Sequence, residues 1–199
     1  MNWKDISIEQ YLELGNVYKI ENPLDRTIAI LSIINDKEDS YYYNLPIDKL
    51  KKETSSMEFL ADKPQPQLKN KIKIEETEYI LNAKIDKWTA GQYIDYMNII
   101  GSTPIDFGLC MAILYIPKGK AYGEDYDVLE VAKLMNTKCP IEYALGISDF
   151  FLKLLTNLTE ATLLSLKKKI AKAMKKEPTK VKPLKEAIKK INQISGSYL

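Results

Sequence analysis

Residues 107–115 are FGLCMAILY, the most apolar run in a chain of 199 residues. Pro104 can open a helix just before this run, because proline fits the first turn of a helix. The uncharged stretch ends at Pro117 and covers about half of the roughly 20 residues that a membrane-spanning helix needs. The run therefore predicts a buried helix over residues 105–115 at the centre of a soluble fold.

Helix-start signals and apolar residues at three- and four-residue spacing predict further helices on both sides of that run. Ser7 and Gln10 have the spacing of a capping box, and Thr89 and Gln92 repeat it. Residues 35–40 are polar and predict a loop. The expected helices cover residues 7–20, 23–34, 46–60, 89–100, 127–135, 159–176, one from residue 140 and a shorter one after residue 183. The helix from Pro23 is expected to bury a stripe made of Leu24, Ile28, Leu31 and Ile34.

The spacing of apolar residues changes to two after Lys71, which is typical of a strand. Ile72 and Ile74 alternate with lysines, a turn follows, and residues 79–85 predict a returning strand. An isolated two-stranded hairpin is only marginally stable in water, so it must pack on helices or pair with another chain. The second alternative makes Ile72, Ile74 and Tyr79 a possible strand-pairing edge.

The sequence thus predicts a mainly α fold, in which a multi-helix globular body carries one short β-hairpin at about residues 71–85. The body is expected to occupy residues 1–157, and residues 158–199 are expected to form a basic, helical C-terminal extension. The N-terminus lacks a basic region followed by an apolar one, so we expect no signal peptide and synthesis in a reducing cytoplasm.

Composition excludes several kinds of active site. The chain has no histidine, which removes histidine-based acid–base chemistry, Ser-His and Cys-His pairs and every His-containing zinc site. Two cysteines, Cys110 and Cys139, cannot form a four-thiolate site. The glycine motifs that bind phosphate are absent, and Arg26 is the only arginine. The residues therefore predict no catalytic, cofactor-binding or metal site.

Two short acidic clusters predict exposed loops rather than cation sites. Residues 123–127, GEDYD, lack the spacing and the glycine of an EF-hand loop, and Asp127 is expected to cap the next helix. Residues 35–39, NDKED, have the same interpretation.

Lysine is concentrated near the C-terminus. Residues 167–190 contain eleven Lys against Glu177 and Glu186, a formal charge of +9, whereas the rest of the chain carries −7. Such an asymmetry is a sequence-level sign of a partner. At 100° per residue, the helix expected over 159–176 has an apolar stripe that includes Leu163, Leu166 and Ile170. The opposite face carries Lys168, Lys169, Lys172, Lys175 and Lys176.

Three interpretations of these lysines remain open. They can face solvent while the apolar stripe packs on the body. They can contact a polyanion, for which DNA is the natural candidate, because each neutralised phosphate releases a counterion. They can also dock on an acidic surface of a partner or of a like subunit, whose body is negative. Adsorption to a membrane is disfavoured, because no Trp or Phe lies on the apolar stripe.

Several short motifs resemble a known group of proteins. They are WTAGQYID at residues 88–95, which follows the hairpin with Tyr79, YIPKG at residues 115–119, Tyr126-Asp127 and Phe150-Phe151. Together they resemble small helical virion or tail-assembly proteins that tailed bacteriophages encode among their structural genes, in particular the crAss-like phages of gut Bacteroidetes. The resemblance covers about residues 3–155 and does not include the lysine-rich segment.

The resemblance implies a non-enzymatic virion protein, made in the host cytoplasm and oligomeric in the particle. One alternative is a ring or connector subunit between portal and tail, whose partners are the portal, the tail or neighbouring ring subunits. The other is a tail assembly chaperone that is not retained in the virion. The lysines keep a third alternative open, a small non-specific DNA-binding protein.

Overall fold

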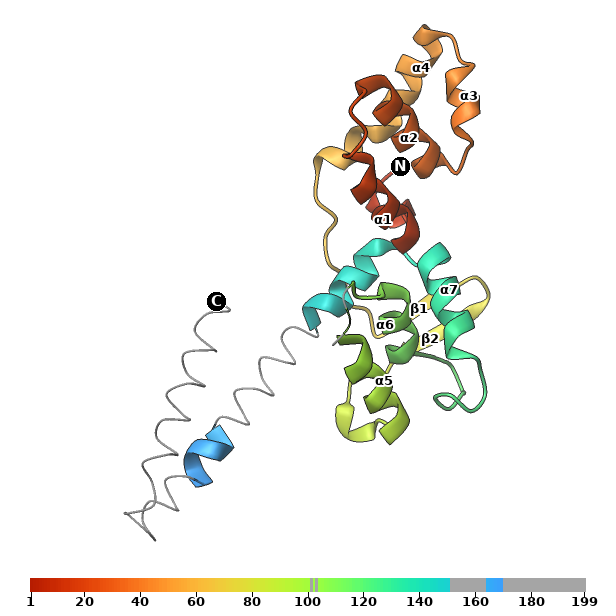
Figure 1. Ribbon diagram of the computed structural model, residues 1–199. Coiled ribbons are helices and arrows are strands. Elements are labelled where there is room, and N and C mark those ends of the chain that lie inside the picture. Colours follow the sequence, from red (N-terminus) through yellow and green to blue (C-terminus); the bar gives the residue numbers. More distant parts are fainter. Residues whose placement is uncertain (101, 103, 151–163, 170–199) are drawn as a thin grey trace. The chain divides into compact units, whose positions relative to one another are not determined.

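A computed structural model of the chain describes residues 1–100, 102, 104–150 and 164–169 (Figure 1). The chain divides into two units, Met1–Phe150 and Phe151–Leu199, and nearly all described residues belong to the first. The predicted fold class is confirmed, because the protein is mainly α with a small antiparallel sheet. The expected body boundary at residue 157 and the expected helix after residue 183 lie outside the described residues.

Figure 1 labels the α-helices and the first two strands. The α-helices are α1 (Ile8–Val17), α2 (Pro23–Asn35), α3 (Asp39–Tyr43), α4 (Ile47–Glu53), α5 (Ala90–Ile100), α6 (Phe107–Leu114) and α7 (Val128–Lys138). Residues 141–150 and 164–169 are also helical. Short 3-10 helices are η1 (Trp3–Asp5), η2 (Thr54–Ala61) and η3 (Ile85–Lys87). The strands are β1 (Lys71–Ile74), β2 (Thr77–Leu81) and β3 (Tyr115–Pro117). No helix in the described part of the chain is both long and apolar enough to cross a membrane.

Capping residues begin α1 and α2 where the sequence predicts them. Ser7 Oγ accepts a hydrogen bond from the Gln10 amide at 3.2 Å, and Gln10 Oε1 accepts one from the Ser7 amide at 2.9 Å. This is the predicted capping box. Asn22 Oδ1 accepts from the Leu24 amide at 2.9 Å, directly before Pro23 at the start of α2. These local signals fix where the first two helices begin.

The apolar run forms α6, which lies beside α5 and α7 and also contacts β3 (Figure 1). Met111, Ala112, Ile113 and Leu114 are completely buried. Gly108 permits the close approach of α6 to α7, because a Cβ there would collide with the backbone oxygen of Ala132 and with Asn136. The prediction of a buried helix is confirmed, but the helix begins at Phe107 after the N-cap Asp106 and not at Pro104, so Ile105 lies outside it and is 46% exposed.

The sheet has three strands in the order β1-β2-β3, one more than the sequence predicts. In the predicted hairpin, Ile72 pairs with Tyr79. The added strand β3 pairs Ile116 with Ile80. The chain leaves the helical conformation at Tyr115, with φ −96° and ψ 99°. Pro117 keeps Ile116 extended, because the residue before a proline favours extended backbone, and pairing with β2 holds the segment as a strand.

The N-terminal segment is held against residues far along the chain. Ile8 donates a backbone hydrogen bond to Cys139 O at 3.1 Å, and Ile141 donates one to Ile6 O at 2.9 Å, which forms an isolated antiparallel bridge. All four of these residues are completely buried. Burial of one isoleucine side chain is worth about 1.5–3 kcal/mol, so this buried contact stabilises the packing of the N-terminal segment on residues 139–141.

Two expectations near the N-terminus need correction. Residues 35–40 were expected to be a loop, but α3 begins within them, because Tyr42 is buried and its hydroxyl accepts a hydrogen bond from Asn35 Nδ2 at 2.9 Å. Leu24 was expected in the buried stripe of α2, but it lies in the first turn and is 47% exposed, whereas Ile28 is 2% exposed.

Several helix and strand ends also differ from the expected ones. The helix expected over residues 46–60 changes to 3-10 geometry at Thr54, whose hydroxyl donates back to Lys51 O at 2.7 Å. Such side-chain bonds compete with the regular helix. In addition, α1 ends at Val17 and β2 ends at Leu81, earlier than expected.

Candidate interaction surfaces

The three residues predicted to form a strand-pairing edge lie on two different strands. Ile72 and Ile74 lie on β1, which pairs only with β2 among the described residues, so one backbone edge of β1 is unpaired there. Their side chains are buried, so another chain would meet the backbone of β1 and not these side chains. The prediction for Tyr79 is wrong, because Tyr79 lies on the central strand between Ile72 and Pro117. The error arose because β3 was not predicted.

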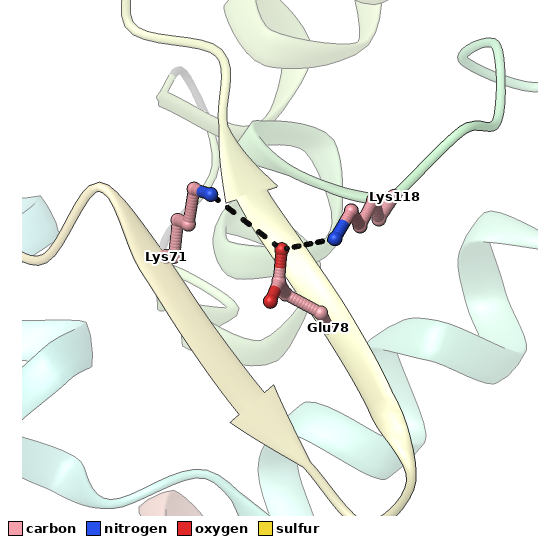
Figure 2. A network of polar contacts seen from close by, with 3 residues as sticks. All are labelled: Lys71, Glu78 and Lys118. Carbon is pink, nitrogen blue, oxygen red and sulfur yellow. Dashed lines mark ion pairs between the residues drawn. The ribbon is translucent and has the colours of Figure 1, made fainter.

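Three charged side chains cross the exposed face of the sheet (Figure 2). Glu78 Oε1 on β2 lies 3.7 Å from Lys71 Nζ on β1 and 3.2 Å from Lys118 Nζ, directly after β3. The hydrogen bond from Lys118 is the main cause that lowers the pKa of the Glu78 carboxyl from its usual value. Lys71 and Lys73 place positive charges on the edge strand β1, and such charges discourage the addition of further strands.

The predicted lysine face is described only in part. Residues 164–169 are helical and exposed, and they include Lys168 and Lys169. Leu166, which was expected on the apolar stripe, is 41% exposed. Lys172, Lys175 and Lys176 lie outside the described residues, so their role stays a prediction.

A cleft of about 620 Å³ is lined by α1, by the C-terminal end of α2 and by the segment that leads from α2 into α3. We call it the acidic cleft, because five carboxylates and one lysine, Lys37, line it, with a formal charge of −4. The carboxylates are those of Glu9, Glu13, Asp36, Glu38 and Asp39. The sequence shows only one wall of the cleft, the acidic cluster NDKED at residues 35–39, which was interpreted as an exposed loop. Packing of α1 on α2 brings Glu9 and Glu13 to the same place.

The charge of the acidic cleft is not neutralised by the described residues. The ion pairs among them, Lys71–Glu78, Lys73–Glu76 and Lys118–Glu78, all lie at the sheet. Lys37 Nζ lies 4.2 Å from the centroid of the Tyr41 ring, in a cation–π contact. Ser32 also lines the cleft; it is 8% exposed, and its Oγ has no hydrogen-bond partner in the part of the chain described.

Two apolar surfaces are also exposed. A groove of about 330 Å³ is lined by Trp3, by residues of α1 and by Tyr18 directly after that helix, and Tyr18 is 78% exposed. On α5, Tyr93, Ile94 and Met97 are 44, 57 and 44% exposed. The sequence predicted this helix but not the position of its solvent side. Exposed apolar clusters of this kind are typical of contact surfaces.

The two cysteines are buried, and the acidic cluster at residues 123–127 makes structural hydrogen bonds. Cys110 and Cys139 are free and buried, and burial raises the pKa of each thiol to about 12. Because the thiolate is the reactive form, both are inert near neutral pH. Asp127 caps α7 as predicted, and Asp125 accepts a hydrogen bond from the Ala121 amide. Over the described residues, no group of three or more His, Cys, Asp or Glu side chains is placed to hold a metal ion.

Comparison of the chain with protein-family models, with curated proteins and with solved structures finds no match. The resemblance to bacteriophage structural proteins therefore stays a prediction. The charge distribution of the chain and the surfaces described above are the basis for a proposed function.

Proposed function

We propose that the protein is a non-enzymatic structural subunit of a tailed bacteriophage, which forms an oligomeric ring or connector in the portal–tail assembly of the virion. The observation that supports this proposal most is the division of charge, +9 over residues 167–190 and −7 over the rest of the chain. A ring subunit meets its neighbours through two different surfaces. Opposite charges on these surfaces favour head-to-tail contact between identical copies.

The described surfaces agree with such a role. In the acidic cleft Lys37 is the one cation against five carboxylates among the described residues, and α5 presents apolar side chains to solvent. A subunit that is surrounded by neighbours covers surfaces of both kinds when it assembles. The motifs at residues 88–95 and 115–119 add the resemblance to tail-assembly proteins.

Native mass of the isolated protein and mass spectrometry of purified phage particles test the proposal together. We expect association at low ionic strength and a fixed number of copies in the particle. Absence from particles, combined with binding to tail proteins, indicates the alternative function of a tail assembly chaperone. A protein that stays monomeric and is absent from particles contradicts the proposal.

A second candidate function, non-specific DNA binding, is favoured by the lysines alone. If they contact phosphates, the logarithm of the binding constant falls with the logarithm of salt concentration, with a slope of about −0.9 for each phosphate neutralised. Filter binding over a range of salt concentrations measures this slope. A slope near zero excludes this candidate and leaves the structural role unaffected.

A further inference from the structure

We propose that the acidic cleft of one copy of this protein binds the lysine-rich segment, residues 167–190, of a second copy. The inference rests on the proposed oligomeric function and names the surface through which neighbouring subunits meet. Charge complementarity identifies the occupant, since the cleft carries −4 and the segment carries +9.

The acidic cleft requires cations from outside its own walls. Glu9 and Glu13 are four residues apart on α1, so their like charges lie on the same face of the helix and repel. Asp36 and its acidic neighbours add charge from the opposite wall. Lys37 does not neutralise them by an ion pair, because its ammonium group lies over the Tyr41 ring. A cationic occupant relieves this repulsion.

The arrangement of the carboxylates favours an extended occupant over a single metal ion. A calcium ion needs six to eight oxygen ligands at about 2.3–2.6 Å from one centre. Among the described residues, no three acidic side chains converge on a common point in this way. A chain with several separate ammonium groups can instead pair with carboxylates that are spread over a cleft of about 620 Å³.

Ser32 provides a second and independent indication of an occupant. Its side chain is buried in the wall of the cleft, and its Oγ has no hydrogen-bond partner among the described residues. A buried hydroxyl without a partner is unfavourable. A lysine ammonium group carries three donors and can satisfy this oxygen.

The spacing of the lysines matches the spacing of the carboxylates. Lys168, Lys172 and Lys176 recur every four residues, as Glu9 and Glu13 do, so one row of ammonium groups can face one row of carboxylates. On a helix these three lysines span about 12 Å. If each cleft binds the segment of the next copy, the contact repeats from subunit to subunit and can close into a ring.

Neutralisation of the cleft tests the proposal in the full-length chain. The variant Glu9→Gln/Glu13→Gln/Glu38→Gln removes three charges with little change in shape, and we expect association to weaken by roughly tenfold to a hundredfold. The matched control, Glu21→Gln/Glu58→Gln/Glu124→Gln, removes three exposed charges outside the cleft and should associate like the wild type. Sedimentation equilibrium at low ionic strength measures both, and circular dichroism checks that each variant is folded.

A mixture distinguishes docking between copies from docking within one chain. The cleft variant keeps its lysines, and a variant in which Lys168, Lys169, Lys172, Lys175 and Lys176 are changed to Glu keeps its cleft. Each alone should be monomeric, whereas the mixture should form a complex of two chains, twice 22.8 kDa. A mixture that stays monomeric overturns the proposal.

The remaining outcomes separate this inference from the proposed function. If the wild type associates and the cleft variant associates equally well, the acidic cleft is not the docking site, but the oligomeric function stands. If the wild type is monomeric at every concentration at low ionic strength, this inference fails, whereas the proposed function fails only if the protein is also absent from phage particles.

Discussion

Gly146 lies where the helix of residues 141–150 passes directly against the backbone at Gln67 and Leu68. A Cβ at this position would overlap Gln67 C and O, and the hydrogen bond from Gln67 N to Glu142 O, 2.8 Å long, holds that backbone in place. We predict that Gly146→Ala lowers the free energy of unfolding by about 2 kcal/mol or more. Urea unfolding followed by circular dichroism measures the change.

Gly15→Ala is the matched control for this substitution. Gly15 lies inside α1, and a Cβ there meets nothing within 4 Å. Because alanine favours the helix more than glycine does, this variant should be more stable by about 0.5–1 kcal/mol. Equal effects of the two substitutions would contradict the close backbone contact at Gly146.

The buried thiols make the stability of the protein fall as the pH becomes alkaline. Burial raises the pKa of Cys110 and of Cys139 from the usual 9.0 to about 12. Above pH 9.0 the folded state therefore keeps thiol protons that the unfolded state releases. The contribution of the two buried thiols to the free energy of unfolding is complete below pH 9.0 and is lost as the pH rises to about 12. We predict that the free energy of unfolding falls over this range.

A thiol reagent gives an independent measurement of the same burial. At about pH 8 neither cysteine should react in the folded protein, and both should react in denaturant, because the exposed thiol ionises more readily. Fast labelling of the folded protein would contradict the burial of Cys110 and Cys139.

Among the elements, the hairpin between β1 and β2 contains a strained residue. Glu75 has φ +51°, in the left-handed region that costs a residue with a Cβ about 1 kcal/mol. We predict that Glu75→Gly raises the free energy of unfolding by about 0.5–1 kcal/mol. Glu76→Gly, at the next turn position without positive φ, should lower it, and thermal unfolding of the two variants compares them.

Elements that depend on local signals could be predicted from the sequence, and those that depend on distant contacts could not. Ser7 and Gln10 form the predicted capping box. At α5, Thr89 caps the helix as predicted, but the Gln92 side chain enters the core and donates to Ile113 O at 2.7 Å. The strand β3 was missed for the same reason, since Tyr115–Pro117 becomes a strand only beside β2.

The acidic cleft shows the same limit for a surface. Its NDKED wall is visible in the sequence, but Glu9 and Glu13 come from another helix, and no local pattern relates them to it. The concentration of lysines, in contrast, is visible in the sequence because it is a property of composition.

At the scale of the whole molecule, five substitutions test the meaning of the charge division. We predict that changing Lys168, Lys169, Lys172, Lys175 and Lys176 to Glu leaves the fold intact and blocks assembly or DNA contact, because the attraction to a negative partner becomes repulsion. Circular dichroism measures the fold, and sedimentation or filter binding measures the contact.

The control for this variant changes the net charge equally at exposed lysines of the first unit. These are Lys49, Lys84, Lys87, Lys120 and Lys133. If both variants lose assembly to the same extent, net charge alone is responsible. If neither loses it, the C-terminal lysines serve only solubility.

The bridge that joins Ile6 and Ile8 to Cys139 and Ile141 has a consequence for biosynthesis. The N-terminal residues leave the ribosome first, but their hydrogen-bonding partners are made only after most of the first unit has been translated. At about 5–20 residues per second, these isoleucines stay exposed on the nascent chain for on the order of ten seconds before their partners are synthesised. During that interval the emerging polypeptide is a natural client for chaperones that shield apolar segments.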